Sequence, residues 1–203
     1  MKSKIRYLIL DIDDVVYDCP ASLLKYVQNT MPGYANATME SLNEIFESVD
    51  GFFKLTPEIV MTILTVQPYC NMALFPYVKN SLYRLKNDGI IFDNFALSST
   101  PDGAKETRTY YLNRDLPGIF TEMILKLGDK GELIQELLER RKIRPEETLF
   151  ADDLRKNILS AQNKNPGLNL AYRRNLRNAH VPNIPGAYNV KDFLEIEALI
   201  RGR

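Results

Sequence analysis

Several types of functional side chain are scarce in this chain of 203 residues. There is one histidine, His180, so a metal site of several histidines is excluded, and Ser-His-Asp catalysis would depend on that residue alone. Its polar surroundings predict an exposed loop residue without a chemical role. The two cysteines, Cys19 and Cys70, lack a metal-ligand spacing and are too few for a disulfide framework. We therefore expect reduced thiols in a cytoplasmic protein.

An excess of charge is also absent, because 26 lysines and arginines balance 26 aspartates and glutamates. No overall field therefore attracts the protein to nucleic acid or to an anionic membrane. The basic cluster of Arg173, Arg174 and Arg177 could contact a nucleic-acid backbone, but no aromatic stacking pattern accompanies it, so a solvated surface is favoured. Neither nucleic acid nor a membrane is an expected partner, and the oligomeric state is left open.

Long apolar runs are missing as well. No stretch approaches the roughly 18 apolar residues that a membrane helix needs. The short apolar run near the N-terminus is interrupted by aspartates and is followed by no small-residue cleavage site, which is not typical of a signal peptide. Apolar residues nevertheless make up 45% of the chain. This is ample for the core of one large domain, or of a domain with an insert.

The distribution of the apolar residues predicts alternating strands and helices. Ile5–Leu10 has the composition of a strand that is buried on both faces. From Pro76 onward the alternation is regular, which implies right-handed crossovers and a parallel sheet covered on both sides. The other predicted strands span 90–99, 118–127, 147–152 and 168–173; the predicted helices span 76–89, 103–115, 130–143, 154–165 and 190–202. Residues 178–189 are predicted to form a loop.

Between the first strand and the helix at Pro76, the spacing is helical throughout. Helices are predicted at Ala21–Met31, Met39–Val49 and Pro57–Val66. The predicted fold class is therefore α/β: a three-layer, Rossmann-like parallel sheet with helices on both faces and a mostly helical insert. The core would comprise residues 1–16 and 76–203, and the insert residues 17–75. In open sheets of this kind, sites lie beyond the carboxyl ends of the strands.

Polar residues of complementary chemistry follow the predicted strands. They are Asp11, Asp13 and Asp14 after the first strand, Ser98 after the second, Lys130 at the start of the helix after the third, and Asp152 and Asp153 after the fourth. In a parallel sheet these segments converge on one edge. Neighbouring carboxylates repel or keep protons unless a hard cation such as Mg²⁺ binds between them. A hydroxyl and an ammonium opposite them suit the oxygens of a phosphoryl group, so the sequence indicates a phosphoryl-transfer site.

Structural roles for the same residues are left open. Asp11 and Asp13 could instead end a strand and bind loop amides. Asp14 could bond to nearby backbone, and the remaining structural roles are a helix cap at Ser98, Asp152 or Asp153 and an ordinary turn at Ser99 and Thr100. Capping and metal binding are compatible for the paired acids.

The same segments resemble the motifs of a known family. "LILDIDDVV" resembles the first motif of the haloacid dehalogenase-like (HAD) hydrolase superfamily, an apolar strand followed by D-x-D-x-T/V. "FALSS" is similar to the second motif, an apolar strand ending in Ser or Thr; "DKGELIQELL" is similar to the third and "TLFADDLRKNILSA" to the fourth. All four occur in order, and the insert lies where the family places a helical cap. The resemblance implies a HAD-type phosphatase with a small cap.

This resemblance also implies roles for the catalytic candidates. Asp11 would be the nucleophile that forms an aspartyl-phosphate. Asp13 would protonate the leaving oxygen and later activate water. Ser98 would bind a phosphoryl oxygen, and Lys130 would hold both the nucleophile and the phosphate. One motif departs from the family pattern, because the "KP" pair that is common after the third-motif lysine is "KG" here, and Lys126 is a rival for the lysine role.

The implied cofactor is Mg²⁺. Its ligands would be the Asp11 carboxylate, the backbone carbonyl of Asp13, and Asp153, with Asp152 as the second choice. Ser99 and the insert residues Phe52 and Phe53 are candidates for substrate binding. The aromatic residues, together with Tyr69, could instead form the core of the insert.

The expected function is Mg²⁺-dependent hydrolysis of a small phosphorylated metabolite, with a nucleoside monophosphate as one candidate substrate. A phosphomutase or dehalogenase of the same fold, and a binding or regulatory protein that has lost turnover, are the competing hypotheses. Asp13 discriminates between phosphate-ester hydrolysis and dehalogenation, because dehalogenases of the family work without this second aspartate and without a metal.

Overall fold

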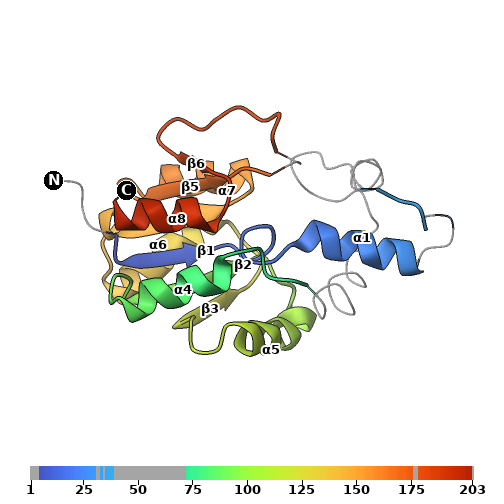
Figure 1. Ribbon diagram of the computed structural model, residues 1–203. Helices are drawn as coiled ribbons and strands as arrows, with labels where there is room; N and C mark the ends of the chain where they lie inside the picture. The colour runs from blue at the N-terminus through green and yellow to red at the C-terminus, as the bar shows by residue number, and fades with distance from the viewer. Residues whose placement is uncertain (1–4, 31–32, 34, 39–71, 176–177, 203) are drawn as a thin grey trace.

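A computed structural model describes residues 5–30, 33, 35–38, 72–175 and 178–202. Within these ranges the fold is built on one six-stranded sheet in which all the pairings are parallel, in the order β3-β2-β1-β4-β5-β6 (Figure 1). The strands are β1 (Tyr7–Leu10), β2 (Asp93–Ser98), β3 (Glu122–Leu125), β4 (Thr148–Asp152), β5 (Asn169–Arg173) and β6 (Tyr188–Val190). The predicted Rossmann-like α/β class is confirmed.

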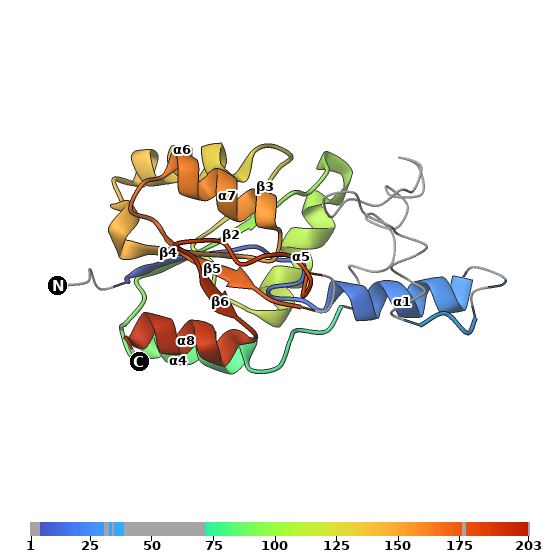
Figure 2. The same cartoon turned by 90° about the horizontal axis from the view of Figure 1, so that it is seen from above.

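Helices cover both faces of the sheet, as the view from above in Figure 2 shows. On one face lie α4 (Val78–Asn87), α5 (Lys105–Asp115) and α8 (Phe193–Arg201); on the other lie α6 (Lys130–Arg141) and α7 (Arg155–Lys164). Each follows a predicted helix closely. No helix among the described residues is both long enough and apolar enough to cross a membrane.

Alternation along β1 explains why its apolar run is continuous. Leu8 and Leu10 belong to the apolar cluster that includes α4 and α8, whereas Ile9 packs with residues of α6 and α7. All three side chains are fully buried. Successive side chains of a strand point to opposite faces, so a central strand covered on both sides needs an apolar residue at every position.

The sixth strand corrects the sequence interpretation. The sequence predicts a loop at Tyr188 and Asn189 and the start of the last helix at Val190, but the three residues pair with β5 instead. Tyr188 and Asn189 are exposed and only Val190 is buried, because β6 is the edge of the sheet. Three residues with one buried side chain carry too little apolar pattern to be recognised as a strand.

The chain leaves and re-enters the core through two segments that lie side by side. Asp18 N donates to Ala73 O at 2.9 Å, and Phe75 N donates to Val16 O at 3.0 Å, so the two connections pair in an antiparallel bridge. The first predicted insert helix is present as α1 (Cys19–Thr30). Met39–Val49, Pro57–Val66, Phe52, Phe53, Tyr69 and Cys70 lie outside the described residues. The division into a core and an insert therefore stays a prediction.

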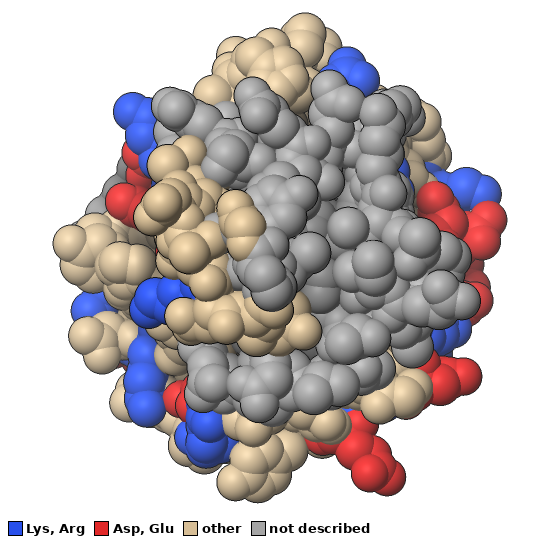
Figure 3. All heavy atoms as spheres, turned by 90° about the vertical axis from the view of Figure 1, so that its right-hand side faces the viewer, with Lys and Arg blue, Asp and Glu red and all other residues tan. Residues whose placement is uncertain are grey.

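Charged side chains on the α1 side of the molecule are mixed in sign. In Figure 3, which faces this side, both blue lysines and arginines and red aspartates and glutamates lie around the rim, with more blue at the lower left and more red at the right. This agrees with the balanced composition of the chain.

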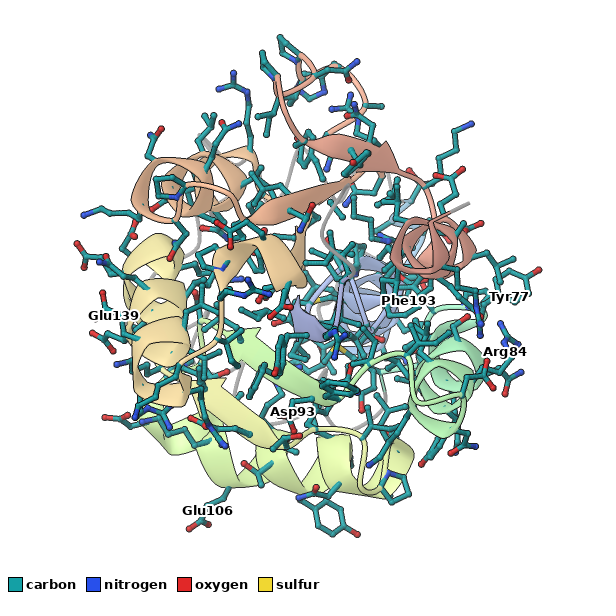
Figure 4. The ribbon with its side chains drawn as sticks, turned by 90° about the vertical axis from the view of Figure 1, so that its left-hand side faces the viewer. Tyr77, Arg84, Asp93, Glu106, Glu139 and Phe193 are labelled. Carbon is teal, nitrogen blue, oxygen red and sulfur yellow. The ribbon has the colours of Figure 1, made fainter. Side chains whose placement is uncertain are left out.

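A buried glutamate joins two of the helices that cover one face. Glu197 of α8 accepts from Arg84 Nε of α4 at 3.2 Å and from Arg201 Nε at 2.9 Å. Figure 4 shows α4, with Arg84, beside α8, with Phe193. The hydrogen bond from Arg84 is the largest cause of a shift that lowers the pKa of Glu197 to about 2. Glu197 therefore stays ionised and paired well into the acid range.

This lowered pKa predicts how the stability of the fold depends on pH. A carboxyl whose pKa is lower in the folded state stabilises the protein above its ordinary pKa, and the contribution is lost as the pH falls towards the folded value. Glu197→Gln should cost about 1 kcal/mol at pH 7, a Tm decrease of roughly 2–4 °C for a chain of this size. The difference from wild type should shrink between about pH 4.5 and pH 2.

The measurement is Tm against pH for the wild type, Glu197→Gln and the control Glu106→Gln. Glu106 is exposed on α5, and its replacement should change Tm little at any pH. A Glu197→Gln difference that stays constant from pH 7 to pH 2 would contradict the assigned role of this ion pair.

Candidate functional site

The candidate residues gather at one edge of the sheet. Leu10, the last residue of β1, pairs with Ala96 of β2 and with Ala151 of β4, so the three strands end within two residues of one another. Asp11 N donates to Ala151 O at 2.9 Å, which extends this register by one residue. The residues that follow the three strands therefore meet at the carboxyl edge of the sheet.

Lys130 connects two of these segments. Its ammonium donates to Asp11 Oδ1 at 2.6 Å and to Asp152 Oδ2 at 2.7 Å, and its side chain is 3% exposed. Burial alone would lower the pKa of Lys130, but the two adjacent carboxylates raise it above its ordinary value. The rival Lys126 is about half exposed and pairs with Glu136. Of the two lysines, the structure places Lys130 beside the predicted nucleophile.

The two acids after β4 have different surroundings. Asp152 also accepts from Leu154 N at 2.7 Å and from the Asn157 side chain at 3.1 Å, so it is held by the residue before α7 and by the first turn of that helix. Asp153 Oδ2 accepts from Asn175 Nδ2 at 3.2 Å, and its backbone carbonyl accepts from Asn178 Nδ2 at 2.8 Å. The predicted capping role is wrong for both acids, since the N-cap of α7 is Leu154 and no side chain caps it; Asp153 is held from the loop after β5.

Three carboxylates converge next to this lysine. Asp11, Asp152 and Asp153 are buried, and each offers an oxygen such that the three atoms lie within 4.8 Å of one another. The expected ligands Asp11 and Asp153 and the second choice Asp152 thus come together. The Asp13 carboxylate is not part of this group, which agrees with the expectation that only its backbone carbonyl would face a metal.

The electrostatics of this group favour a divalent cation. Three carboxylates beside one ammonium leave two negative charges in a buried site. In the absence of a cation, burial raises the pKa of Asp11 to about 7 against the opposing effect of Lys130, and the Asp152 and Asp13 charges add to the rise. Burial and the charges of Asp152 and Asp11 raise the pKa of Asp153 well above its ordinary value. An all-oxygen set of this charge fits Mg²⁺.

Ser98, at the end of β2, is buried and held by its own turn. Thr100 Oγ1 donates to Ser98 Oγ at 3.1 Å, and Thr100 N donates to Ser98 O at 2.9 Å. Thr100 is itself buried, whereas Ser99 is exposed. Thr100, expected as an ordinary turn residue, therefore orients the Ser98 hydroxyl, and no described contact places Ser99 in the site.

Asp13 pairs with a residue that the sequence did not suggest. Arg108 Nη2 donates to both carboxylate oxygens of Asp13, at 2.8 and 2.7 Å. Arg108 comes from α5 and is 2% exposed, whereas the Asp13 side chain is 29% exposed. Asp13 therefore lies at the solvent side of a pair whose cation is buried.

The predicted solvated surface at the basic cluster is wrong for Arg173, and Arg177 lies outside the described residues. Arg173 is buried, donates from Nη1 to Asp14 O at 2.5 Å and lies over the Phe75 ring at 3.8 Å. Asp14 has a left-handed backbone, with φ of 61°, and its N–H donates to Tyr17 O. Arg173, at the end of β5, thus contacts both the segment after β1, at Asp14, and the segment before α4, at Phe75.

Comparison with known proteins identifies the fold of this chain. No protein-family model matches the chain, and no curated protein matches it in sequence. Solved structures do match. A predicted phosphatase from Clostridium acetobutylicum superimposes with a TM-score of 0.69 at 17% identity, over 99% of this chain and 100% of that one. The L-2-haloacid dehalogenase of Xanthobacter autotrophicus gives 0.66 at 13% identity, over 98% and 99%.

A third match is YfnB of Bacillus subtilis, assigned as a HAD-hydrolase and bound to magnesium, with a TM-score of 0.62 at 18% identity over 98% of this chain and 100% of that one. The chain has the HAD-hydrolase fold. At these identities the likeness establishes the fold and leaves the reaction open, since the matching structures include both phosphatases and dehalogenases.

His180 is exposed, as predicted. The residues that the sequence missed in this HAD fold are those that hold the predicted ones. Asn157, Asn175, Asn178, Thr100 and Arg108 each bond to a candidate site residue. Asn157 had a detectable signal, since it lies in the first turn of a helix just after the paired acids. Arg108 had none, because it is one charged residue in a polar helix.

The glycine that departs from the HAD-fold "KP" pattern has a packing reason. A Cβ added to Gly131 would lie 2.5 Å from Ser160 Oγ and 2.6 Å from the Ser160 carbonyl oxygen. Asn165 Nδ2, near the end of α7, donates to Gly131 O at 3.0 Å. The first turn of α6 therefore touches α7, and no larger residue fits beside Lys130.

Gly131→Ala should consequently lower stability, by about 1–3 kcal/mol as for other overpacked sites. Alanine normally stabilises a helix relative to glycine by about 1 kcal/mol, so the predicted sign is the reverse of the usual one. The measurement is denaturant unfolding. Adding Ser160→Ala should restore little, because the Ser160 carbonyl oxygen remains in place. A more stable Gly131→Ala protein would contradict this packing.

Proposed function

We propose that this protein is a Mg²⁺-dependent phosphomonoester hydrolase that works through an aspartyl-phosphate on Asp11. The observation that carries the proposal is the buried group of Asp11, Asp152 and Asp153 around Lys130. A divalent cation would offset the carboxylate charge, and the cation together with the Lys130 ammonium would then offset the negative charge of a phosphoryl group.

The cation would be held by Asp11, Asp153 and the backbone carbonyl of Asp13. Asp152 is the weaker candidate, because its oxygens already accept from Lys130, Leu154 N and Asn157. When bound, Mg²⁺ would neutralise the phosphoryl oxygens and allow the anionic nucleophile to approach them.

The side chains of Asp11, Asp13, Ser98 and Lys130 have separate roles in the reaction. The Asp11 carboxylate attacks phosphorus, and the bond to the leaving oxygen breaks as that oxygen takes a proton from Asp13. The Asp13 carboxylate then removes a proton from water, which attacks the aspartyl-phosphate and releases phosphate. Ser98 donates its hydroxyl to a phosphoryl oxygen, and Lys130 orients Asp11 throughout.

Asp13 also favours ester hydrolysis over dehalogenation. The resemblance implies that dehalogenases of this fold lack the second aspartate, and here Asp13 is present and held by Arg108. A phosphorylated alcohol needs a proton donor for its leaving oxygen, whereas a departing halide needs none.

For the substrate we infer a small soluble phosphomonoester, with nucleoside monophosphates as one candidate class. The test is phosphate release over a panel of phosphorylated metabolites, with and without Mg²⁺, run beside 2-haloacids with halide detection. Phosphate release that needs Mg²⁺ supports the proposal. Halide release alone, or no turnover of any ester, would overturn it.

Asp11→Asn should abolish turnover while leaving the protein folded. The amide keeps the shape of the carboxylate but has no charge with which to attack, so kcat should fall by at least about 10⁴-fold. Phosphate release and the circular dichroism spectrum are measured together. The charge control is Asp102→Asn, whose side chain is 95% exposed and which should keep full activity. Substantial activity in a folded Asp11→Asn protein would rule out the nucleophile.

Removal of the metal should abolish activity completely and reversibly. A chelator should abolish phosphate release, and added Mg²⁺ should restore it. Ca²⁺ should inhibit at least about tenfold, because its longer bonds and looser coordination disturb the alignment of the reacting groups. Asp153→Asn should weaken Mg²⁺ binding, measured by calorimetry or as a thermal shift, by more than Asp152→Asn. Full activity in chelator would contradict the metal's role.

A further inference from the structure

Arg108 is a buried cation that has no role of its own in the proposed reaction. Its guanidinium is buried, yet the same nitrogen, Nη2, reaches both oxygens of Asp13. A buried cation is costly to move, whereas a carboxylate that is 29% exposed can turn at little cost. Arg108 is therefore the fixed member of the pair, and Asp13 is the member it positions.

Helix α5 holds the segment after β1 at a second point. The Tyr17 hydroxyl donates to Asp115 Oδ2 at 2.9 Å, at the last residue of α5, and to Tyr111 O at 3.3 Å. Tyr17 is buried, and Leu112 anchors α5 in the core. Both ends of the segment from Asp13 to Tyr17 are thus tied to one helix, so α5 sets where Asp13 lies relative to Asp11.

Because one nitrogen, Arg108 Nη2, binds both carboxylate oxygens of Asp13, the carboxylate can rotate and still keep the ion pair. The carboxylate can present either oxygen to a leaving group while the other stays bound to Nη2. Once the proton has passed to the leaving oxygen, the carboxylate that remains lies beside a cation. Arrangements of this kind orient an acid or base and stabilise the charge that its reaction leaves behind.

We propose that Arg108 is a positioning residue for Asp13: it aims the acid/base carboxylate at the leaving-group oxygen and stabilises the charge left after proton transfer. The inference rests on the proposed hydrolysis. It assigns to Arg108 an effect on leaving-group protonation alone, without contact with the phosphoryl group or the metal.

The effect should depend on how much the leaving group needs a proton. An alkyl phosphate releases a poor leaving group, and its hydrolysis needs the full contribution of general acid catalysis, about 10²-fold or more. p-Nitrophenolate departs almost without protonation. Arg108→Met should therefore lower kcat/KM about 100-fold for an alkyl phosphate and less than about tenfold for p-nitrophenyl phosphate, the same pattern as Asp13→Asn.

The experiment is a double-mutant cycle on both esters in excess Mg²⁺. Arg108→Met and Asp13→Asn should act as one unit, so the double variant should be no slower on the alkyl ester than the slower single variant. Arg108→Lys, which keeps a positive charge, should recover part of the alkyl-ester rate. The control Lys105→Met removes a solvent-accessible ion pair with Asp102 from the first turn of the same helix and should leave both rates within about twofold. Tm is recorded for every variant.

The outcomes separate this inference from the proposed function. Phosphate release by the wild type, with a selective and non-additive loss in Arg108→Met, supports the inference. Equal losses on the two esters, or losses that multiply in the double variant, would mean that Arg108 only supports the fold and would overturn it. No phosphate release by the wild type from either ester or from the metabolite panel would overturn the proposed function, and the inference with it.

Discussion

The ion pair on which the site depends is the contact of Lys130 with Asp11 and Asp152. It joins the ends of β1 and β4 to the start of α6. Asp11 and Asp152 are more than a hundred residues apart in the sequence. Two buried carboxylates on neighbouring strands would repel without it. The contact requires the first turn of α6 to lie close over α7, and this is why Gly131 follows the lysine.

The charges of the site form two separate groups. Around Lys130, three buried carboxylates converge in an all-oxygen group that suits a divalent cation. Asp13 stands outside this group and is balanced by Arg108 from another helix. Asp11 and Asp13 are two residues apart in sequence, yet each has its own buried cation. In the proposed mechanism, this separation would let Asp11 attack while Asp13 exchanges a proton.

Much of the fold could be predicted because strands buried on both faces, such as β1, have continuous apolar runs and end at polar residues. Asp11, Ser98, Lys130, Asp152 and Asp153 were found in this way, since parallel strands bring their carboxyl ends to one edge. The edge strand β6 was missed because only Val190 is buried. Arg108 and the asparagines that hold Asp153 were also missed, because a partner supplied from a distant segment leaves no local pattern.

The central claim is that Asp11 becomes phosphorylated during turnover. Its most direct test is to mix the wild-type protein with a hydrolysed ester and Mg²⁺, quench in acid within one turnover, and locate the phosphoryl group by mass spectrometry after borohydride reduction of the acyl phosphate. The reduced residue should be Asp11, and Asp11→Asn should show no such product. A phosphoryl group on another residue, or turnover with no covalent intermediate at any quench time, would contradict it.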